Sequence, residues 1–156
     1  MQYLFENVSG EFFAMLGAAI AFFVAGMGSS KGVGIAGQAG AGVLTGDPDK
    51  FGPVMILQAL PSTQAIYGFV IAFLILGNVG GGDITLEKGL FLFAAGLPVG
   101  FVGYLSAVYQ GKVAASGINM IAKKADDIGR AIVLALMVEM FAIISFIVSI
   151  LMIGKV

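Results

Sequence analysis

The sequence contains no cysteine, no histidine and no tryptophan, and it has few charged residues. Without cysteine and histidine it has no disulfide, no thiol nucleophile, no imidazole base and no ordinary zinc site, which excludes most hydrolytic and redox enzymes. Asp, Glu, Lys and Arg together make up 11% of the 156 residues, against about 25% in an ordinary soluble domain. With a net charge of -1 and no run of basic residues, nothing indicates nucleic-acid binding.

Apolar residues dominate what is present. They make up 59% of the chain, and the mean hydropathy is +1.03. Such a chain has too little polar surface to cover a compact body in water. The sequence therefore predicts a protein that is embedded in lipid.

Charged residues divide the chain into four long apolar tracts, and a helix that crosses a bilayer needs roughly 20 consecutive apolar residues. The tracts predict one membrane domain, residues 1–156, with two hairpins at residues 12–79 and 88–154. The predicted helices span about residues 12–43, 51–79, 88–121 and 129–154. Three short links join them: Gly46 to Lys50, Gly80 to Asp83 and Lys123 to Asp127. Because short links place neighbouring helices antiparallel, the predicted fold class is an all-α membrane protein with four transmembrane helices.

The two hairpins resemble each other, which indicates an internal duplication. In their first helices, Val33 to Gly37 resembles Val113 to Gly117, an alignment we call the Val33/Val113 register. In their second helices, Phe69 to Ile71 resembles Phe146 to Val148, an alignment we call the Phe69/Phe146 register. The two registers differ by three positions, which predicts a longer link in the first hairpin.

Lysine and arginine are unevenly distributed between the two ends of the predicted helices. Six of them flank the links inside the hairpins: Lys31, Lys50, Lys112, Lys123, Lys124 and Arg130. Only Lys88 and Lys155 lie at the opposite ends. Because basic residues favour the cytoplasmic side, this bias predicts a multi-pass protein of the cell membrane. The links after the first and third helices would be cytoplasmic, and both termini would lie outside.

Glycine is the compositional outlier, with 24 residues. Gly32 to Gly37 matches a dinucleotide fingerprint, but no strand precedes it, so no nucleotide or other organic cofactor is expected. The glycines instead make the first and third helices thin, and small residues let helices approach closely in lipid. Thin helices of this kind are suited to the inside of an assembly.

Glu139 is the most informative residue, because it is the one charge inside the fourth apolar tract. A carboxylate near the bilayer centre costs at least about 2.5 kcal/mol, and such residues usually face a partner or an ion path. In the Phe69/Phe146 register, the first hairpin has Ser62 in its place. Residues that could meet Glu139 share one face of the second helix or lie on the third: Leu60, Thr63, Gln64, Tyr67 and Gln110.

Depth indicates that these groups can meet. At about 1.5 Å per residue, the polar side chains lie roughly 14 to 20 Å from the same membrane face. Hydroxyl, amide and carboxylate oxygens suit an alkali or alkaline-earth cation, and one negative charge matches one monovalent ion. Pro61 lacks an N–H, so it frees a carbonyl one turn back and can turn other backbone oxygens towards the site. Tyr67 could donate its phenol proton to Glu139. For Thr63 and Gln64, ordinary hydrogen bonding between helices is the alternative interpretation.

At these residues the chain resembles, over essentially its whole length, the membrane-rotor proteolipid (subunit K/c) of bacterial vacuolar-type and archaeal-type rotary ATPases. The resemblance is carried by Lys31 to Gly34, Leu60 to Gln64, Tyr67 to Val70, Gln110 to Ala115 and Met137 to Glu139. It implies a homo-oligomeric rotor ring with the first and third helices inside and the others outside. In sodium-pumping members the ion is held by oxygens that map here to Leu60, Thr63, Gln64, Gln110 and Glu139, with Tyr67 bonded to the carboxylate.

The resemblance implies a non-catalytic subunit that carries Na⁺ on Glu139 while partner subunits hydrolyse or synthesise ATP. Expected partners are identical subunits, lipid, a stator subunit with an essential arginine and a central-stalk subunit at the cytoplasmic links. The nearest alternative is a proton-translocating ring in which Tyr67 and Thr63 satisfy a protonated Glu139. A small dimeric cation exporter would need an aromatic pocket around Glu139, and a structural pore or fusion proteolipid leaves the oxygen set unexplained.

Overall fold

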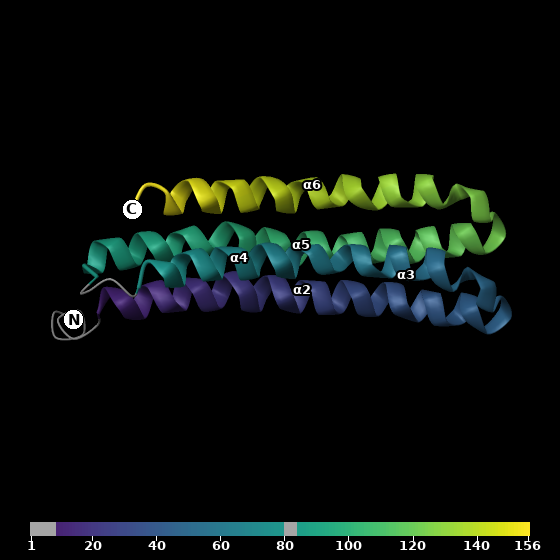
Figure 1. Ribbon diagram of the computed structural model, residues 1–156, viewed down its shortest axis with the longest axis horizontal. Coiled ribbons are helices and arrows are strands. Elements are labelled where there is room, and N and C mark those ends of the chain that lie inside the picture. The colour runs from purple at the N-terminus through teal and green to yellow at the C-terminus, as the bar shows by residue number, and fades with distance from the viewer. Residues whose placement is uncertain (1–8, 80–83) are drawn as a thin grey trace.

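The computed structural model describes residues 9–79 and 84–156 as a bundle of long helices (Figure 1). In chain order the elements are α2 (Gly10–Gly46), η1 (Pro48–Lys50), α3 (Phe51–Ala59), η2 (Leu60–Ser62), α4 (Thr63–Gly77), α5 (Leu86–Lys123), η3 (Ala125–Asp127) and α6 (Ile128–Ile153). The predicted link from Gly80 to Asp83 lies outside the described residues. Ser9 and Thr85 cap the starts of α2 and α5, because each side-chain oxygen accepts a backbone N–H at 3.3 Å.

The helices form four stretches that are long and apolar enough to cross a membrane. Their bounds are Gly10–Gly46, Pro48–Gly77, Leu86–Lys123 and Ala125–Ile153. Successive stretches run in opposite directions, with the links after α2 and α5 at one end of the bundle and the C-terminus at the other (Figure 1). The predicted fold class, an all-α membrane protein with four transmembrane helices, is confirmed.

The second stretch is not one continuous α-helix, because Pro61 interrupts it. Proline cannot donate the N–H that would bond to the Leu57 carbonyl, and its ring crowds the preceding turn. The chain adopts the 3₁₀ turn η2 between α3 and α4, in which the Thr63 N–H bonds to the Leu60 carbonyl. This tighter turn lies at the depth where the polar side chains gather.

The two hairpins match at their links in the Phe69/Phe146 register, although α3, η2 and α4 of the first hairpin correspond to the single helix α6 of the second. Matching ends are Gly46 with Lys123, Pro48 with Ala125, and Phe51 with Ile128. The packing of side chains shows the same register. A Cβ added to Gly40 would meet Val54, and a Cβ added to the equivalent Gly117 would meet Ala131, which is equivalent to Val54. The links inside the two hairpins therefore have equal lengths.

The Val33/Val113 register that the sequence predicts for the first helices is wrong. The longer link that it implies for the first hairpin is wrong as well. The similarity of Val33 to Gly37 with Val113 to Gly117 comes from small residues. Small residues recur every three or four positions along a tightly packed helix, so such a pattern also matches itself when it is shifted by nearly one turn.

Helices α2 and α5 approach closely because glycines line their contact. A Cβ added to Gly17 would lie 2.6 Å from the Cα atom of Phe93. Gly32 and Gly111 face each other backbone to backbone. A side chain at these positions would force the two helices apart, and close packing is what holds helices together in lipid.

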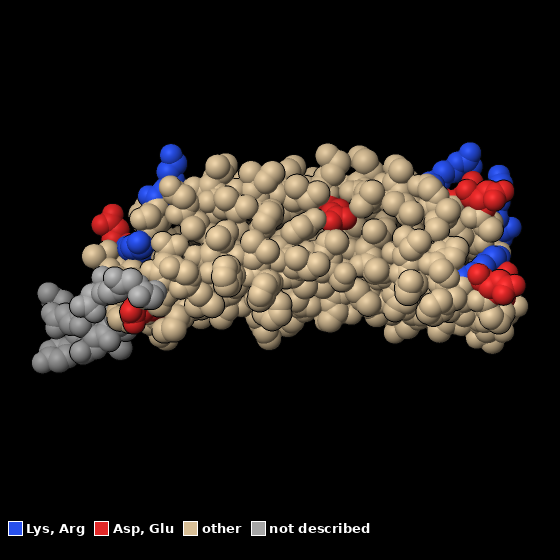
Figure 2. All heavy atoms as spheres, viewed as in Figure 1, with Lys and Arg blue, Asp and Glu red and all other residues tan. Residues whose placement is uncertain are grey.

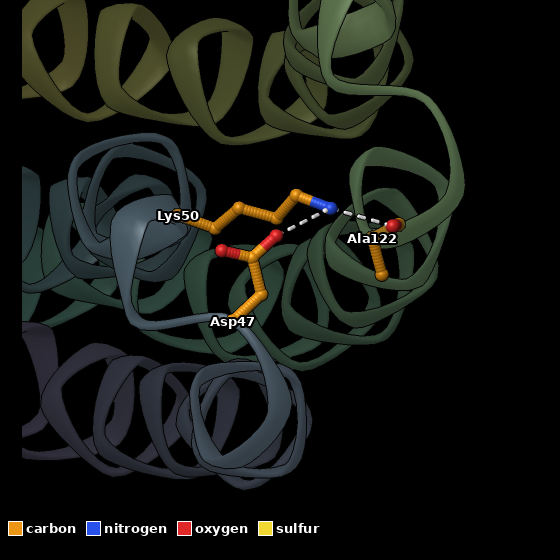
Figure 3. A network of polar contacts seen from close by, with 3 residues as sticks. All are labelled: Asp47, Lys50 and Ala122. Atoms are coloured by element: carbon orange, nitrogen blue, oxygen red, sulfur yellow. Dashed lines mark hydrogen bonds and ion pairs between the residues drawn. The ribbon is translucent and has the colours of Figure 1, made fainter.

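Lys50 ties the two hairpins together at the end of the bundle that carries both of their links (Figure 3). Its Nζ lies 2.6 Å from the carbonyl oxygen of Ala122, in the last turn of α5, and 3.1 Å from Oδ2 of Asp47. The last carbonyl groups of a helix lack partners inside the helix, so a cation complements them. Lys50 therefore fixes the link of the first hairpin against the helix end of the second.

Charged side chains gather at the two ends of the bundle, and the flank between them is uncharged apart from one acidic patch (Figure 2). Large apolar side chains such as Phe73 and Leu151 are exposed between the ends, as suits a surface in lipid. Lys31 and Lys112 are also exposed and lie well inside α2 and α5 rather than in their last turns.

Candidate functional site

Among the residues that the structure describes, Glu139 alone has its carboxyl group inside the bundle. Glu139 is in the middle of α6, about 17 Å from the start of the helix at 1.5 Å per residue. The residue is only 5% exposed. Each other acidic residue that the structure describes lies in a link or in the first turn of a helix. Because an unpaired buried carboxylate is costly, its partners determine what it can do.

Both oxygens of the Glu139 carboxyl group accept hydrogen bonds from neighbouring helices. The Tyr67 hydroxyl, on α4, donates to Oε1 at 2.8 Å. The Gln110 Nε2 group, on α5, donates to Oε2 at 3.0 Å. The Tyr67 ring stacks on Phe146 of α6, with ring centroids 5.2 Å apart. Three helices therefore meet at the carboxyl group and hold it in one orientation.

Further polar groups continue from Gln110 towards the η2 turn. The Oε1 atom of Gln110 accepts a hydrogen bond from Nε2 of Gln64 at 2.6 Å. The Thr63 hydroxyl lies 3.3 Å from Oε1 of Gln64 and 3.1 Å from the Leu60 carbonyl oxygen. Both glutamines are fully buried. The network thus joins a backbone carbonyl, a hydroxyl, two amides and a carboxyl group inside an apolar bundle.

The structure brings together the groups that the sequence places at one depth. They are Leu60 of η2, Thr63, Gln64 and Tyr67 of α4, Gln110 of α5 and Glu139 of α6. Pro61 lies beside them, buried against Gly32 of α2, and contributes through the η2 turn. Antiparallel helices rise by the same distance per residue, so equal distances from one face bring these side chains into contact.

Two serines of this region were missed by sequence reasoning. Ser106 donates to a backbone carbonyl of α6 at 3.0 Å and accepts from Nε2 of Gln64 at 3.3 Å. Ser29 accepts the backbone N–H of Ala65 at 3.0 Å. Spacing could have found them, because Ser106 lies one turn before Gln110 and Ser29 matches Ser106 in the Phe69/Phe146 register.

Within the described residues, every buried polar side-chain atom has a hydrogen-bond partner. The same residues contain no group of three or more His, Cys, Asp or Glu side chains that could share a metal ion. The site instead offers one carboxylate and several neutral oxygens, which is a donor set for a hard monovalent cation. Such a cation must compete with the N–H of Gln110 for the carboxylate.

A duplicated antiparallel hairpin with one buried carboxyl group at mid-membrane depth defines the chain as a membrane-sector proteolipid. The model of the family described as the C subunit of ATP synthase matches residues 16–75 and again residues 93–152. The two matches pair residue 16 with residue 93 and residue 75 with residue 152, which is the Phe69/Phe146 register of the structure. The chain belongs to this family of ATP synthase C subunits, and the resemblance to rotor proteolipids is confirmed.

Relatives extend along the whole chain. The V-type sodium ATPase subunit K of Enterococcus hirae is 47% identical over 153 residues, which cover 98% of this chain and 97% of that protein. The A-type ATP synthase subunit K of Methanocaldococcus jannaschii is 41% identical over 137 residues, or 88% of this chain and 60% of that protein. The 16 kDa proteolipid of the V-type proton ATPase of Homo sapiens is 27% identical over 154 residues, or 96% and 99% of the two chains.

Proposed function

We propose that the chain is the non-catalytic, ion-carrying subunit of a V-type rotary ATPase or ATP synthase, and that identical copies form its rotor ring. Glu139 carries Na⁺ across the membrane as the ring turns, and ATP is hydrolysed or made on other subunits. The observation that carries the proposal is one buried carboxyl group bonded into a network of neutral polar side chains from three helices. The 47% identity to a subunit named for a sodium ATPase supports the choice of ion.

The proposed Na⁺ ligands are the oxygens of this network. They are the Leu60 carbonyl, the Thr63 hydroxyl, the side-chain oxygens of Gln64 and Gln110, and the Glu139 carboxylate. One carboxylate neutralises one Na⁺ ion. Ca²⁺ or Mg²⁺ would leave an uncompensated positive charge where Glu139 is only 5% exposed, and such burial is penalised heavily. Charge balance therefore favours a monovalent cargo.

Ion binding requires both glutamines to rearrange. In the structure the N–H of Gln110 is directed at Glu139, and the N–H of Gln64 is directed at Oε1 of Gln110. A cation binds the oxygen of an amide and repels its N–H group, so Gln110 must turn its amide to become a ligand. This turn removes one of the two acceptors of the Gln64 Nε2 group, leaving Ser106, and it brings two amide N–H groups face to face, so Gln64 must rearrange as well. The two amides respond to the ion as a coupled pair.

Tyr67 positions the carboxylate and lies outside the proposed ligand set. Its hydroxyl bonds to Oε1 of Glu139, whereas Gln110 bonds to Oε2. Stacking on Phe146 keeps the Tyr67 ring in place. Glu139 therefore retains one hydrogen bond, and its orientation, while Gln110 turns.

Neutralisation of charge explains how the site passes through lipid. With Na⁺ bound, Glu139 carries no net charge, so the loaded site can face lipid as the ring rotates. At the stator, an arginine from another subunit displaces the ion, because a guanidinium group pairs strongly with a bare carboxylate. Release and reloading on opposite sides of this arginine give the transport its direction.

The basic residues support an orientation with both links in the cytoplasm. Basic residues in or next to the links are Lys50, Lys123, Lys124 and Arg130, against Lys88 and Lys155 at the other end. This bias remains after Lys31 and Lys112, which lie inside helices, are set aside. The η1 and η3 turns are the proposed docking site of a central-stalk subunit. The bond from Lys50 to the Ala122 carbonyl holds these two turns in a fixed relation.

A proton-carrying ring is the second candidate, and one observation favours it. Both carboxyl oxygens of Glu139 and every buried amide of the described residues are satisfied by hydrogen bonds within the chain. The human relative, at 27% identity, is named for a proton ATPase. Dependence on Na⁺ distinguishes the two candidates.

The proposed function is tested by ATP-driven uptake of radioactive sodium into vesicles that contain the whole ATPase complex. Glu139→Gln keeps the size of the side chain and removes its charge, so we expect uptake to stop while the ring remains intact on a native gel. Glu87→Gln is the matched control, because Glu87 lies in the first turn of α5, far from the network, and we expect it to retain uptake. Sodium uptake by the Glu139→Gln complex would contradict the proposal.

A further inference from the structure

One flank of the chain carries an open groove. The groove lies between α2 and the stretch formed by α3, η2 and α4, and its lining on α2 includes Gly26, Met27, Ser29, Val33 and Gly34. A Cβ added to Gly26 or Gly34 would meet nothing within 4 Å. The glycines on the α5 side of the same helix are, in contrast, packed against backbone. Helix α2 therefore has two small-residue faces, and only one of them is covered within the chain.

The opposite flank, between α5 and α6, is bulky and apolar. Leu105, Tyr109 and Phe141 lie there together and are each more than half exposed. Phe141 is the most exposed of the three, at 65%. These three large side chains line an apolar pocket on their flank. Head-to-tail contacts between the two flanks of identical copies close into a ring when the rotation fits.

The internal repeat predicts how the α5–α6 flank of one copy meets the groove of the next copy. Because the hairpins match in one register, the second hairpin of one copy can pack on the first hairpin of the next as the two hairpins pack within the chain. Within the chain, Gln64 lies on α5, and a Cβ added to Gly103 would be 3.7 Å from the Cβ of Gln64. In the Phe69/Phe146 register, the residue equivalent to Gln64 is Phe141 and the residue equivalent to Gly103 is Gly26. The contact between Gln64 and Gly103 within the chain therefore predicts a contact between Phe141 of one copy and Gly26 of the next.

Two other contacts behave in the same way. The contact of Gly32 with Gly111 within the chain predicts a contact of Tyr109 with Gly34 between copies. The contact of Gly28 with Tyr104 likewise predicts a contact of Leu105 with Met27. All three predicted pairs join one of the large exposed side chains of the α5–α6 flank to a residue that lines the groove. The groove and the exposed large side chains are seen in the single chain without any use of the repeat, so the two observations are independent.

We propose that Leu105, Tyr109 and Phe141 of one copy insert into the groove of the next copy, with Phe141 seated on Gly26 and Tyr109 on Gly34. The occupant of the groove is thus a second copy of this chain. This inference rests on the ring assembly in the proposed function and is independent of which ion the ring carries.

The proposed interface between copies is equivalent, in the Phe69/Phe146 register, to the contact within the chain that contains the ion site, but apolar residues and a serine replace the proposed ligands. In this register, Gln64 is replaced by Phe141, Thr63 by Met140, Gln110 by Val33, Tyr67 by Ile144 and Glu139 by Ser62. Apolar side chains thus fill the space that polar ligands occupy within the chain. Two kinds of contact between hairpins would alternate around the ring. The contact within each chain contains the carboxylate site, and the contact between copies is apolar and holds the copies together.

Disulfide formation tests the contact directly, because the chain contains no cysteine. Gly26→Cys and Phe141→Cys, introduced together, lie on opposite flanks of one chain and cannot react within it. Between copies, the distance of 3.7 Å at the equivalent pair falls within the roughly 3.5 to 4.5 Å that a disulfide needs between Cβ atoms. Rings are checked on a native gel, oxidised with copper phenanthroline and run on a denaturing gel. We expect a ladder from dimers to the complete ring.

The control pair keeps Gly26→Cys and moves the second cysteine to Ile147, which is exposed but lies about 9 Å further along α6 on another face. This pair is expected to remain monomeric on the denaturing gel. Intact rings of the first pair that yield no ladder, or yield no more ladder than the control pair, would overturn the proposal.

A second variant tests the groove without cysteine. Gly26→Leu fills the groove and is expected to abolish the ring, leaving single chains of wild-type helix content by circular dichroism. Gly42→Leu is the control, because an added Cβ there also meets nothing within 4 Å and Gly42 does not line the groove. Ring assembly of Gly26→Leu at the wild-type level would also overturn the proposal. Rings that assemble as proposed but carry no Na⁺ would contradict the proposed cargo and leave this interface intact.

Discussion

Removal of the Thr63 hydroxyl should weaken Na⁺ binding without changing how Glu139 binds a proton. The hydroxyl lies 3.1 Å from the Leu60 carbonyl oxygen and 3.3 Å from Oε1 of Gln64. The hydrogen bonds to Glu139 come instead from Tyr67 and Gln110. Thr63→Val keeps the branched shape of the side chain and replaces the hydroxyl group with a methyl group, so it separates binding of the metal from binding of the proton.

The size of the effect follows from the charge of the ion. A hydrogen bond to a charged group contributes about 1.5 to 3 kcal/mol, and we expect a neutral oxygen on Na⁺ to contribute a similar amount. Each 1.4 kcal/mol is about a factor of ten in affinity. The Na⁺ concentration that half-occupies the site should therefore rise about 10- to 150-fold in Thr63→Val.

The assay is the rate at which a carbodiimide modifies Glu139 in the purified ring, because the reagent needs a protonated carboxyl group and bound Na⁺ excludes the proton. Ser62→Ala is the matched control. It removes the adjacent hydroxyl, which bonds to the Ala59 carbonyl at 2.6 Å outside the network. Without Na⁺ the rates should be equal in wild type and both variants. Protection of Thr63→Val at wild-type Na⁺ concentrations would refute the assignment of this hydroxyl as a ligand.

Three further variants follow from the contacts. Tyr67→Phe loses the 2.8 Å bond to Glu139, so Na⁺ protection should weaken about tenfold or more while the ring persists on a native gel; unchanged protection would show that Tyr67 does not position the carboxylate. Gly17→Val should prevent accumulation in membranes on an immunoblot, because an added Cβ lies 2.6 Å from backbone, whereas Gly77→Val, in open space, should accumulate; equal amounts would contradict the close helix contact. Lys50→Met loses the 2.6 Å bond to α5 and should lower the temperature at which the ring dissociates in detergent; an unchanged temperature would contradict the role of Lys50.

Much of the fold is predictable from the sequence because charge and hydropathy vary on the scale of whole helices. Runs without charge, such as Phe51 to Gly82, are long enough to cross a bilayer, and short links leave few ways to arrange the helices. The register of the duplication is not predictable from the glycine-rich helices, because small residues match at several shifts. The larger residues of Phe69 to Ile71 determine the correct register.

The candidate site is predictable in membership and not in detail. Depth along antiparallel helices suffices to bring Gln110 and Glu139 together. The direction of each amide depends on its neighbours in three dimensions, so the N–H of Gln110 directed at the carboxylate is visible only in the structure. The role of Ser106 was missed for a similar reason, because a serine in a helix commonly bonds within its own helix, whereas Ser106 bonds to α6 and Gln64.

The central claim, that Glu139 binds Na⁺ in competition with the proton, is tested most directly by one measurement on the wild-type ring. The rate of carbodiimide modification of Glu139 is measured at fixed pH without added salt, with NaCl, and with KCl at equal ionic strength. Our account predicts that NaCl slows the modification and that KCl leaves it at the rate without salt. Equal rates in NaCl and KCl would contradict it and would make Thr63, Gln64 and Gln110 hydrogen-bonding residues of a proton-carrying ring.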